Sequence, residues 1–414
     1  NTTASYNVAI GKDSLKLNTT GEQNVAVGNG SLQANTTAAD NTAMGSGAMA
    51  ANTTGHSNTG IGRAALNANT TATSNTAVGY YALVANLTGD HNTAIGKNAL
   101  DSTTTGGYNV AVGSQTMDVN TTGINNVAVG YAALNVSTTA GWNTAVGYYT
   151  LVSNTTGAYN TAIGAHALDA NTTAATNTAL GYHAGTAATT GGRNVMIGYG
   201  GGGATTTGAD NVIIGAEAGN YTNANTTGND NVTIGAYCRN SSTTVTGETV
   251  IGRYALGQGA NTATLGISGN GATISLDGSD TSWAAHSDER LKENITTSTA
   301  GLSFINDLRP VTYTWKSKKD IPQEFENYYD ADSDDPVNGV AGKTYHGFVS
   351  QEMKATIDAH AEVKDGNNLW SERLDDIQQV APSNLVPMMV KAIKELSAEV
   401  EALKSQPKCK CNEE

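Results

Sequence analysis

A short phrase of alternating polar and apolar residues recurs along the first two thirds of the chain. Its form is Asn-(Thr/Val)-Ala-hydrophobic-Gly, and copies begin every 17 residues from Asn7 to Asn211. A 20-residue step then leads to Asn231, a further 17 residues lead to Glu248, and a shortened copy begins at Asn261. Such alternation has the period of a strand with one buried face. Within each unit it predicts two short extended pieces separated by glycine and closed by an Asn-x-Thr-Gly turn.

Each unit is too short to bury a core, so its stability has to come from stacking on its neighbours. About fifteen coils spaced at about 4.8 Å would make a rod on the order of 70 Å long. The interior positions are small, mainly Ala, Val, Ile and Leu, and the whole chain has only three Phe. Because one stack with so thin an interior would bury little apolar surface, we expect three stacks about a common axis. The predicted fold is a mainly β repeat rod, a parallel β-roll or β-helix, in a homotrimer.

Two further features follow the same period. Asn-x-Thr sequons lie at the turn of the repeat, and we interpret their asparagines as stacked turn caps, with glycosylation relevant only in a eukaryotic host; they are Asn18, Asn35, Asn52, Asn69, Asn120, Asn154 and Asn171. Tyrosines that follow the repeat glycine predict an aromatic ladder along the rod, with a sugar-stacking face as the alternative; they are Tyr80, Tyr81, Tyr131, Tyr148, Tyr149 and Tyr182.

Charge divides the chain into two parts. Residues 1–270 hold only 7 of the 22 Lys and Arg and 11 of the 36 Asp and Glu. The net charge of −14 and the lack of a basic cluster argue against a nucleic-acid partner, since such binding needs concentrated Lys and Arg. No apolar run approaches the ~20 residues of a membrane span, so the protein is not expected to be membrane-embedded. The chain opens at Asn1 inside a repeat-like phrase, so we expect an N-terminal attachment region to precede it.

The cysteines and acids give no sign of a metal or cofactor. Cys238 lies in a late repeat and is expected to be a small buried residue, and Cys409 and Cys411 alone cannot complete a tetrahedral zinc site. We therefore expect no cofactor and no metal. A glycan depolymerase would need carboxylates about 5–10 Å apart, and the repeats offer only sparse candidates, which are Asp90, Asp101, Asp118, Asp169, Asp210 and Asp230.

The repeats, over roughly residues 5–266, resemble known fibrous families. An Asn-Ser-Val-Ala-Ile-Gly-like phrase builds the left-handed parallel β-roll of the heads of trimeric autotransporter adhesins, and many phage tail-fibre shafts carry similar repeats. The 17-residue period here is longer than the period of the adhesins. The resemblance implies a trimeric fibre.

Four sequence blocks in the charged C-terminal part resemble a second family. The most specific string is Ser-Asp-Glu-Arg-Leu-Lys-Glu-Asn-Ile at 287–295, followed by blocks at 308–315, 345–352 and 385–387. In this order, over 287–404, they closely resemble the intramolecular chaperone domain at the C-terminus of endosialidase tailspikes and other phage fibres. The resemblance implies a small α+β domain that promotes trimer assembly and then cleaves itself from the fibre.

The same resemblance implies where the chemistry lies. It assigns a catalytic Ser/Lys dyad to Ser287 and Lys292 and cleavage to the bond between His286 and Ser287. A serine hydroxyl becomes a good nucleophile once a nearby base takes its proton, and a lysine of lowered pKa can be that base. His346 and Glu352 match a further block as supporting residues. His346 would orient the dyad or help trimerisation, with a satisfied core histidine as the alternative.

The last helix carries a row of apolar residues with 3-4 spacing, typical of a coiled-coil seam. By itself the choice of residues favours two strands, so three chains are expected from the family resemblance and from the rod. The seam consists of Val386, Met389, Ile393, Leu396, Val400 and Leu403.

These patterns predict five segments and one overall function. The segments are a repeat shaft at 1–270, a connector at 271–286, a chaperone autoprotease domain at 287–384, a trimerisation helix at 385–404 and a polar tail at 405–414. We expect a phage tail fibre or spike, made in the host cytoplasm and carried on the virion, whose shaft binds a host surface glycan or outer-membrane component. The alternatives are a cell-surface, adhesin-like filament and a tailspike with depolymerase activity.

Overall fold

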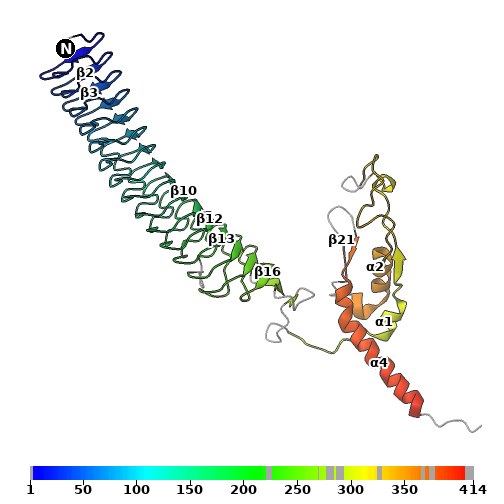
Figure 1. Cartoon of the computed structure of the whole chain (residues 1–414). Helices are drawn as coiled ribbons and strands as arrows, with labels where there is room; N and C mark the ends of the chain where they lie inside the picture. Colours follow the sequence, from blue (N-terminus) through cyan, green and yellow to red (C-terminus); the bar gives the residue numbers. More distant parts are fainter. Residues whose placement is uncertain are drawn as a thin grey trace, which may run out of the picture. The chain divides into compact units, whose positions relative to one another are not determined.

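The structure is a computed structural model of the whole chain. It describes residues 3–220, 226–268, 270–276, 284–285, 293–323, 329–364, 369–372 and 378–405. The chain divides into two units, Asn1–Ser287 and Asp288–Glu414, and each is described separately below (Figure 1).

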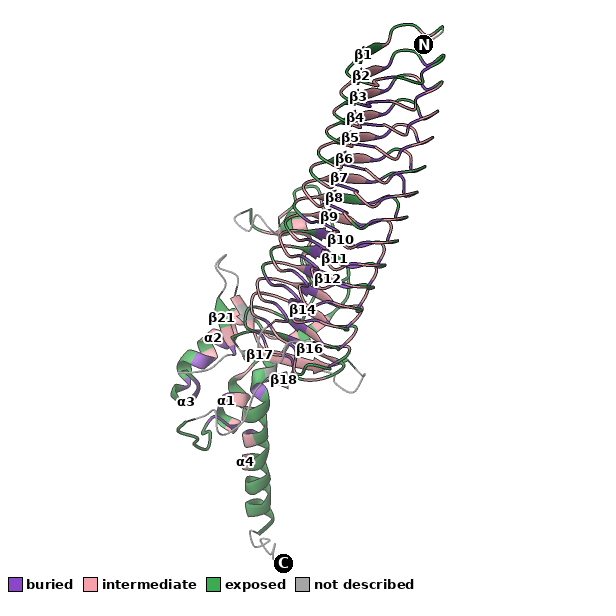
Figure 2. Ribbon diagram, turned by 90° about the vertical axis from the view of Figure 1, so that its left-hand side faces the viewer, coloured by how far each residue is buried: buried purple, intermediate pink, exposed green. Residues whose placement is uncertain are grey.

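The first unit is a parallel β-solenoid in which each 17-residue coil contributes one three-residue strand. Each strand pairs with the same three positions of the next coil, as in Val8 with Val25 (Figure 2). The step is 20 residues between β13 and β14 and 14 residues between β15 and β16. The strands are β1 Val8–Ile10, β2 Val25–Val27, β3 Thr42–Met44, β4 Thr59–Ile61, β5 Thr76–Val78, β6 Thr93–Ile95, β7 Val110–Val112, β8 Val127–Val129, β9 Thr144–Val146, β10 Thr161–Ile163, β11 Thr178–Leu180, β12 Val195–Ile197, β13 Val212–Ile214, β14 Val232–Ile234 and β15 Thr249–Ile251. The predicted repeat rod is confirmed.

The predicted second extended piece of each unit is wrong. After the strand the chain runs through turns in which non-glycine residues adopt the left-handed conformation, such as Tyr81 with φ 56° and Leu83 with φ 53°. This conformation costs roughly 1–2 kcal/mol for an L-residue. It turns Leu83 into the core, where the side chain is fully buried, and burial of a leucine gains about 1.5–3 kcal/mol. The repeat glycine is needed too: Gly79 has φ 144°, and a Cβ there would lie 2.3 Å from the carbonyl oxygen of Gly96.

The solenoid core closes within one chain. The middle residue of most strands is a fully buried alanine, and a fully buried leucine or methionine from the turn belongs to the same cluster. Glycine replaces that leucine at Gly185 and Gly202, and in the coil after each of them the strand position grows from alanine to Met196 and Ile213. A Cβ at Gly185 would lie 2.7 Å from the Met196 Cε, so core volume is conserved. Small side chains from adjacent coils therefore fill the solenoid interior within one chain, and the expected trimer rests on the C-terminal part rather than on this interior.

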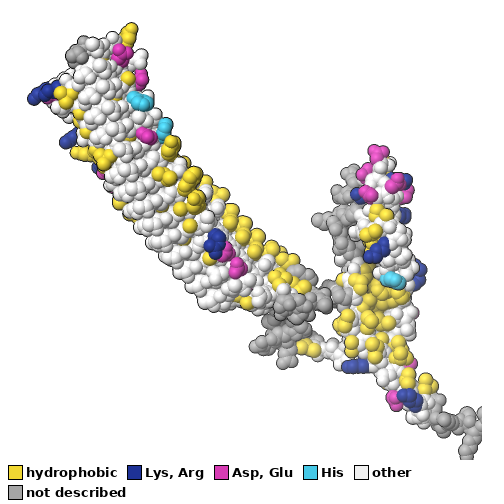
Figure 3. Space-filling view, viewed as in Figure 1, with side chains coloured by type: hydrophobic (Ala, Val, Ile, Leu, Met, Phe, Trp, Pro, Cys, Tyr) yellow, Lys and Arg dark blue, Asp and Glu magenta, His cyan; other side chains and the backbone are white. Residues whose placement is uncertain are grey.

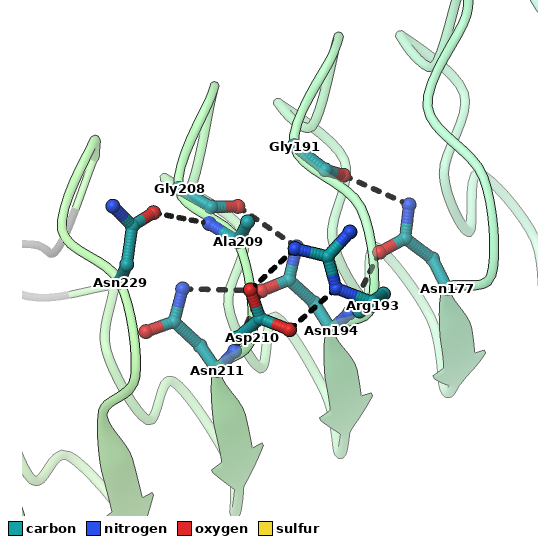
Figure 4. Close-up of polar contacts among 9 residues, drawn as sticks. All are labelled: Asn177, Gly191, Arg193, Asn194, Gly208, Ala209, Asp210, Asn211 and Asn229. Carbon is teal, nitrogen blue, oxygen red and sulfur yellow. Dashed lines mark hydrogen bonds and ion pairs between the residues drawn. The ribbon is translucent and has the colours of Figure 1, made fainter.

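Two ladders of buried asparagines link successive coils. At the start of the strands, the Asn194 amide N–H donates to Asn177 Oδ1 at 2.9 Å, and the Asn177 side chain donates to the Gly191 carbonyl at 2.9 Å (Figure 4). At the turn, Asn35 Nδ2 donates to Asn18 Oδ1 at 2.9 Å and to the Ala38 carbonyl at 3.0 Å. The sequon asparagines are buried turn caps, as predicted, because their amides satisfy backbone groups that water cannot reach.

The C-terminal end of the solenoid differs from the prediction. Strand β16, Thr262–Ile267, still pairs parallel with β15, but β17, Asn270–Ser275, pairs antiparallel with β16 along six residues. Strand β18, Ala284–Ala285, pairs antiparallel with β17. Residues 271–275 and 284–285 of the expected connector are therefore part of the sheet. The reversed strand covers the edge of the last coil, which would otherwise expose unpaired backbone groups.

The second unit is a small α+β domain around one core cluster, as expected. Phe304, Met353, Ile357 and Leu369 form the centre of that cluster and are almost fully buried. Strand β19 pairs antiparallel with β20, and β21 pairs antiparallel with β22. The elements are α1 Leu302–Asp307, β19 Val311–Tyr313, the 3-10 turn Lys318–Asp320, β20 Tyr345–Gly347, α2 Ser350–Ala359, α3 Ala361–Lys364, β21 Trp370–Glu372, β22 Gln378–Val380, the 3-10 turn Pro382–Leu385 and α4 Val386–Ser405.

Candidate functional site

The predicted cleavage site lies outside the described residues. His286, Ser287 and Lys292 all fall there, so the Ser/Lys dyad remains a prediction. The supporting residues His346 and Glu352 lie in the described part of the domain.

His346 lies on a strand surface. It is in β20, opposite Thr312 of β19, and its side chain is exposed in the single chain. It lines an open groove of about 500 Å³ with Pro310, Phe348 and Pro382. The alternative of a satisfied core histidine is therefore wrong. An exposed imidazole beside a groove can meet another segment or another chain.

Glu352 is held by an arginine from a different block of the sequence. It lies in the first turn of α2, and both of its oxygens accept hydrogen bonds from the guanidinium of Arg309, with Nε to Oε2 at 2.8 Å. This pairing holds the pKa of the Glu352 carboxyl below its usual range and raises the pKa of Arg309. A carboxylate kept ionised in this way is suited to orienting a cation rather than to accepting a proton.

His360 is a polar site that the sequence did not single out. Its Nε2 lies 2.8 Å from an Asp307 carboxylate oxygen, and its Nδ1 lies 2.9 Å from a Glu362 carboxylate oxygen. Its ring meets Phe304 edge to face at 5.3 Å. Hydrogen bonds to Glu362 and Asp307 raise the pKa of His360. The imidazole links Asp307 of α1 to Glu362 of α3, and no local sequence signal marks a pair that is 53 residues apart.

Helix α4 has two neighbouring faces with different environments. One face packs on its own domain: Ala392 is buried, and Glu395 Oε2 accepts a hydrogen bond from the Leu302 amide at 2.6 Å, at the start of α1. The other face is the predicted seam, whose six side chains are between 40% and 65% exposed in the single chain; they are Val386, Met389, Ile393, Leu396, Val400 and Leu403. An apolar row of this length favours contact with another chain.

Some of the scattered acids of the shaft are held by contacts between neighbouring coils. Asp210 accepts two hydrogen bonds from Arg193 on the preceding coil, each at 2.6 Å (Figure 4). Asp169 accepts one from a threonine hydroxyl of the next coil at 2.6 Å. Asp101 and Asp118 occupy the same place in adjacent coils. Burial raises the pKa of both carboxyl groups, and the negative charge of Asp118 raises the pKa of Asp101 further. Contacts between coils therefore account for Asp169 and Asp210.

Metal ligands do not cluster in the described ranges, where no group of three or more His, Cys, Asp and Glu is placed to hold an ion. Cys238 is fully buried, its thiol donates to the Gly235 carbonyl at 2.8 Å, and burial raises its pKa to about 12. Cys409 and Cys411 lie outside the described residues. Among the described helices, none is long and apolar enough to cross a membrane.

The C-terminal part matches a known family. Residues 287–362 fit the model of the S74 peptidase family that is described as chaperone of endosialidase. No curated protein matches the chain. The matched segment begins at Ser287, where the solenoid unit ends. In sequence, a segment that matches the chaperone-of-endosialidase family thus follows a β-solenoid of about fifteen turns, an organisation that fits a tail fibre or spike protein with a C-terminal trimer-assembly chaperone.

Proposed function

We propose that this chain is a phage tail fibre or spike protein whose shaft attaches to the host surface and whose chaperone domain releases itself after assembly. The observation that supports this most directly is the family match, which begins at the residue proposed as the nucleophile. A division of the chain into two units at the same place supports release of one unit from the other.

The proposed release is a single-turnover hydrolysis. The Ser287 hydroxyl adds to the carbonyl carbon of His286 while Lys292 takes the hydroxyl proton. The bond between the His286 carbon and the Ser287 nitrogen then breaks, Lys292 returns the proton to the leaving amine, and an ester joins His286 to the serine oxygen. Water hydrolyses that ester. The products are a shaft that ends at His286 and a domain that begins at Ser287.

Trimer assembly is proposed to depend on the exposed face of α4. Contact between three copies would bury the six seam residues that one chain leaves in water. Such contact also solves a register problem, since nearly identical coils can slip by 17 residues and still pair asparagine with asparagine. Loss of the chaperone afterwards would leave a fibre that unfolds only slowly, which is a kinetic form of stability.

Intact mass under denaturing conditions tests the cleavage. We expect wild-type protein to give fragments 1–286 and 287–414, Ser287→Ala and Lys292→Met to give the full chain, and the matched control Ser298→Ala to cleave like wild type. Cleavage of Ser287→Ala at the same bond would refute the assignment of the nucleophile. Soluble, regular trimers from a chain that lacks 287–414 would refute the assembly role.

Binding of the assembled protein to host cells tests attachment. We expect the cleaved shaft to sediment with cells that the parent phage infects and not with resistant cells that have lost the surface polymer. Equal sedimentation with both would contradict the proposal.

A further inference from the structure

One corner of the shaft carries exposed aromatic rings on neighbouring coils. The residue immediately before the strand-start asparagine is Tyr108, Trp142 or Tyr159 in coils near the middle of the shaft, and these side chains are 61%, 55% and 59% exposed. Tyr108 stacks on His91 with ring centroids 4.9 Å apart, and Trp142 stacks on Tyr159 at 6.2 Å. We name His91, Tyr108, Trp142 and Tyr159 the aromatic corner. Hydrophobic side chains also gather in a row on the face of the shaft that Figure 3 shows.

The fold does not require rings at this corner. Ser57 and Ser74 occupy the same place in earlier coils with φ of 58° and 57°, close to the 60° of Tyr108 and the 62° of Trp142. An exposed serine therefore makes the same turn without placing an aromatic ring in water. These rings are neither required by the turn nor buried in the core. Exposed aromatic side chains of this kind indicate a ligand-binding surface.

A groove lies beside the corner. It has a volume of about 360 Å³, within the range of sites for small molecules. Gly107 lines the groove next to Tyr108, at the position where the coil before it has Asp90 and the coil after it has Ile124. Asp90 is fixed by the Thr73 amide, which donates to its Oδ1 at 2.5 Å. The groove is lined by one ring and several polar groups, among them Thr88, Asp90, Thr105, Tyr108 and Asn125.

We propose that the aromatic corner and this groove bind a linear, uncharged polysaccharide that runs along the shaft. This inference rests on the proposed attachment function and gives it a place and a ligand class. The apolar faces of sugar rings pack on flat aromatic rings, while sugar hydroxyls donate to a carboxylate and exchange hydrogen bonds with hydroxyls and amides. Tyr108 and Trp142 are two coils apart, a span of roughly 10 Å along the axis. The corner thus offers two pairs of rings, His91 with Tyr108 and Trp142 with Tyr159, separated by the coil of Asn125, and a polymer of ring-shaped units running along the axis can contact both pairs.

A nearly uncharged surface favours an uncharged ligand. The groove carries one carboxylate, Asp90, and the nearest shaft cation in the sequence is Lys97, in a different part of its coil. A polyanionic glycan would call for Arg or Lys to pair with its charges. Carboxylate and amide acceptors suit the hydroxyl groups of a neutral chain.

The test uses the full chain and a glycan array that carries neutral and acidic bacterial surface oligosaccharides. The variants Tyr108→Ser and Trp142→Ser place at the corner the residue that the repeat already uses there. The matched control is Tyr199→Ser: Tyr199 is 58% exposed and follows the repeat glycine, where Ser46 and Ser114 occupy the same place in other coils. Native mass measured on every variant reports the number of chains.

We expect wild type and Tyr199→Ser to bind at least one neutral oligosaccharide on the array, and each corner variant to bind it at least tenfold more weakly. Binding of acidic glycans alone, unchanged affinity in the corner variants, or an equal loss in Tyr199→Ser would overturn the proposal. A change in the number of chains in the corner variants would show that the corner is a contact between copies, which also overturns it. Cell attachment that survives Tyr108→Ser/Trp142→Ser would refute this site alone, whereas wild-type protein that fails to attach would refute the proposed function.

Discussion

Removing one buried asparagine amide from the strand-start ladder should weaken the shaft locally and strongly. Asn126 is fully buried; its Nδ2 donates to the Ala140 carbonyl at 2.9 Å, and its Oδ1 accepts from the Asn143 amide at 3.0 Å. Asn126→Ala leaves both backbone groups buried and unpaired, at a cost of about 1–3 kcal/mol each. We therefore expect the local opening free energy to fall by about 2 kcal/mol or more, which is roughly a 30-fold loss of amide protection.

Native-state hydrogen exchange followed by mass spectrometry measures this effect. Peptides that cover 126–146 should exchange faster in the variant, while peptides several coils away should not change, because each coil contacts only its neighbours. The control is Asn67→Ala, which removes a half-buried side chain with one bond, to the Gly47 carbonyl at 2.8 Å. Protection within threefold of wild type in Asn126→Ala, or equal losses in the two variants, would refute the reasoning from buried unpaired groups.

Three further outcomes follow from the same contacts. Ala188→Asn should stabilise its coil by about 1 kcal/mol, because the new amide can donate to Asn171 Oδ1, a buried acceptor without a partner among the described residues; faster exchange across this coil would contradict that. Gly79→Ala should abolish soluble, ordered shaft, since its Cβ would lie 2.3 Å from the Gly96 carbonyl oxygen; a soluble variant with the wild-type circular dichroism spectrum would contradict the close approach. The raised pKa of His360 predicts a chaperone domain whose extra stability is complete below the unfolded pKa of about 6.5 and is lost as the pH rises through the folded pKa. Thermal unfolding of the Ser287→Ala chain at pH 6 and pH 8 should show this loss, and His360→Gln should remove the difference between the two pH values.

The sequence determined the parts of this protein that depend on a local, repeated pattern. A phrase that recurs every 17 residues fixes the register of the stack, because identical positions pair and their asparagines form buried ladders. The family resemblance of the C-terminal blocks likewise identified the chaperone domain, since short motifs in order are read directly from the chain.

The tertiary structure decided the backbone turns and the contacts between distant residues, which a repeated sequence pattern does not encode. Leu83 and its equivalents turn inward and fill the core of one chain, and this requires left-handed turns at residues whose type does not predict that conformation. The partner of Glu352 lies 43 residues away at Arg309, and the reversal of β17 on β16 ends the parallel stack without a change in the alternating pattern. The sequence alone marked the seam of α4, but only packing showed that Ala392 and Glu395 hold the neighbouring face on the domain and leave the seam exposed in the single chain. Contacts between distant segments depend on the final path of the chain, so they are settled only when the whole fold has formed.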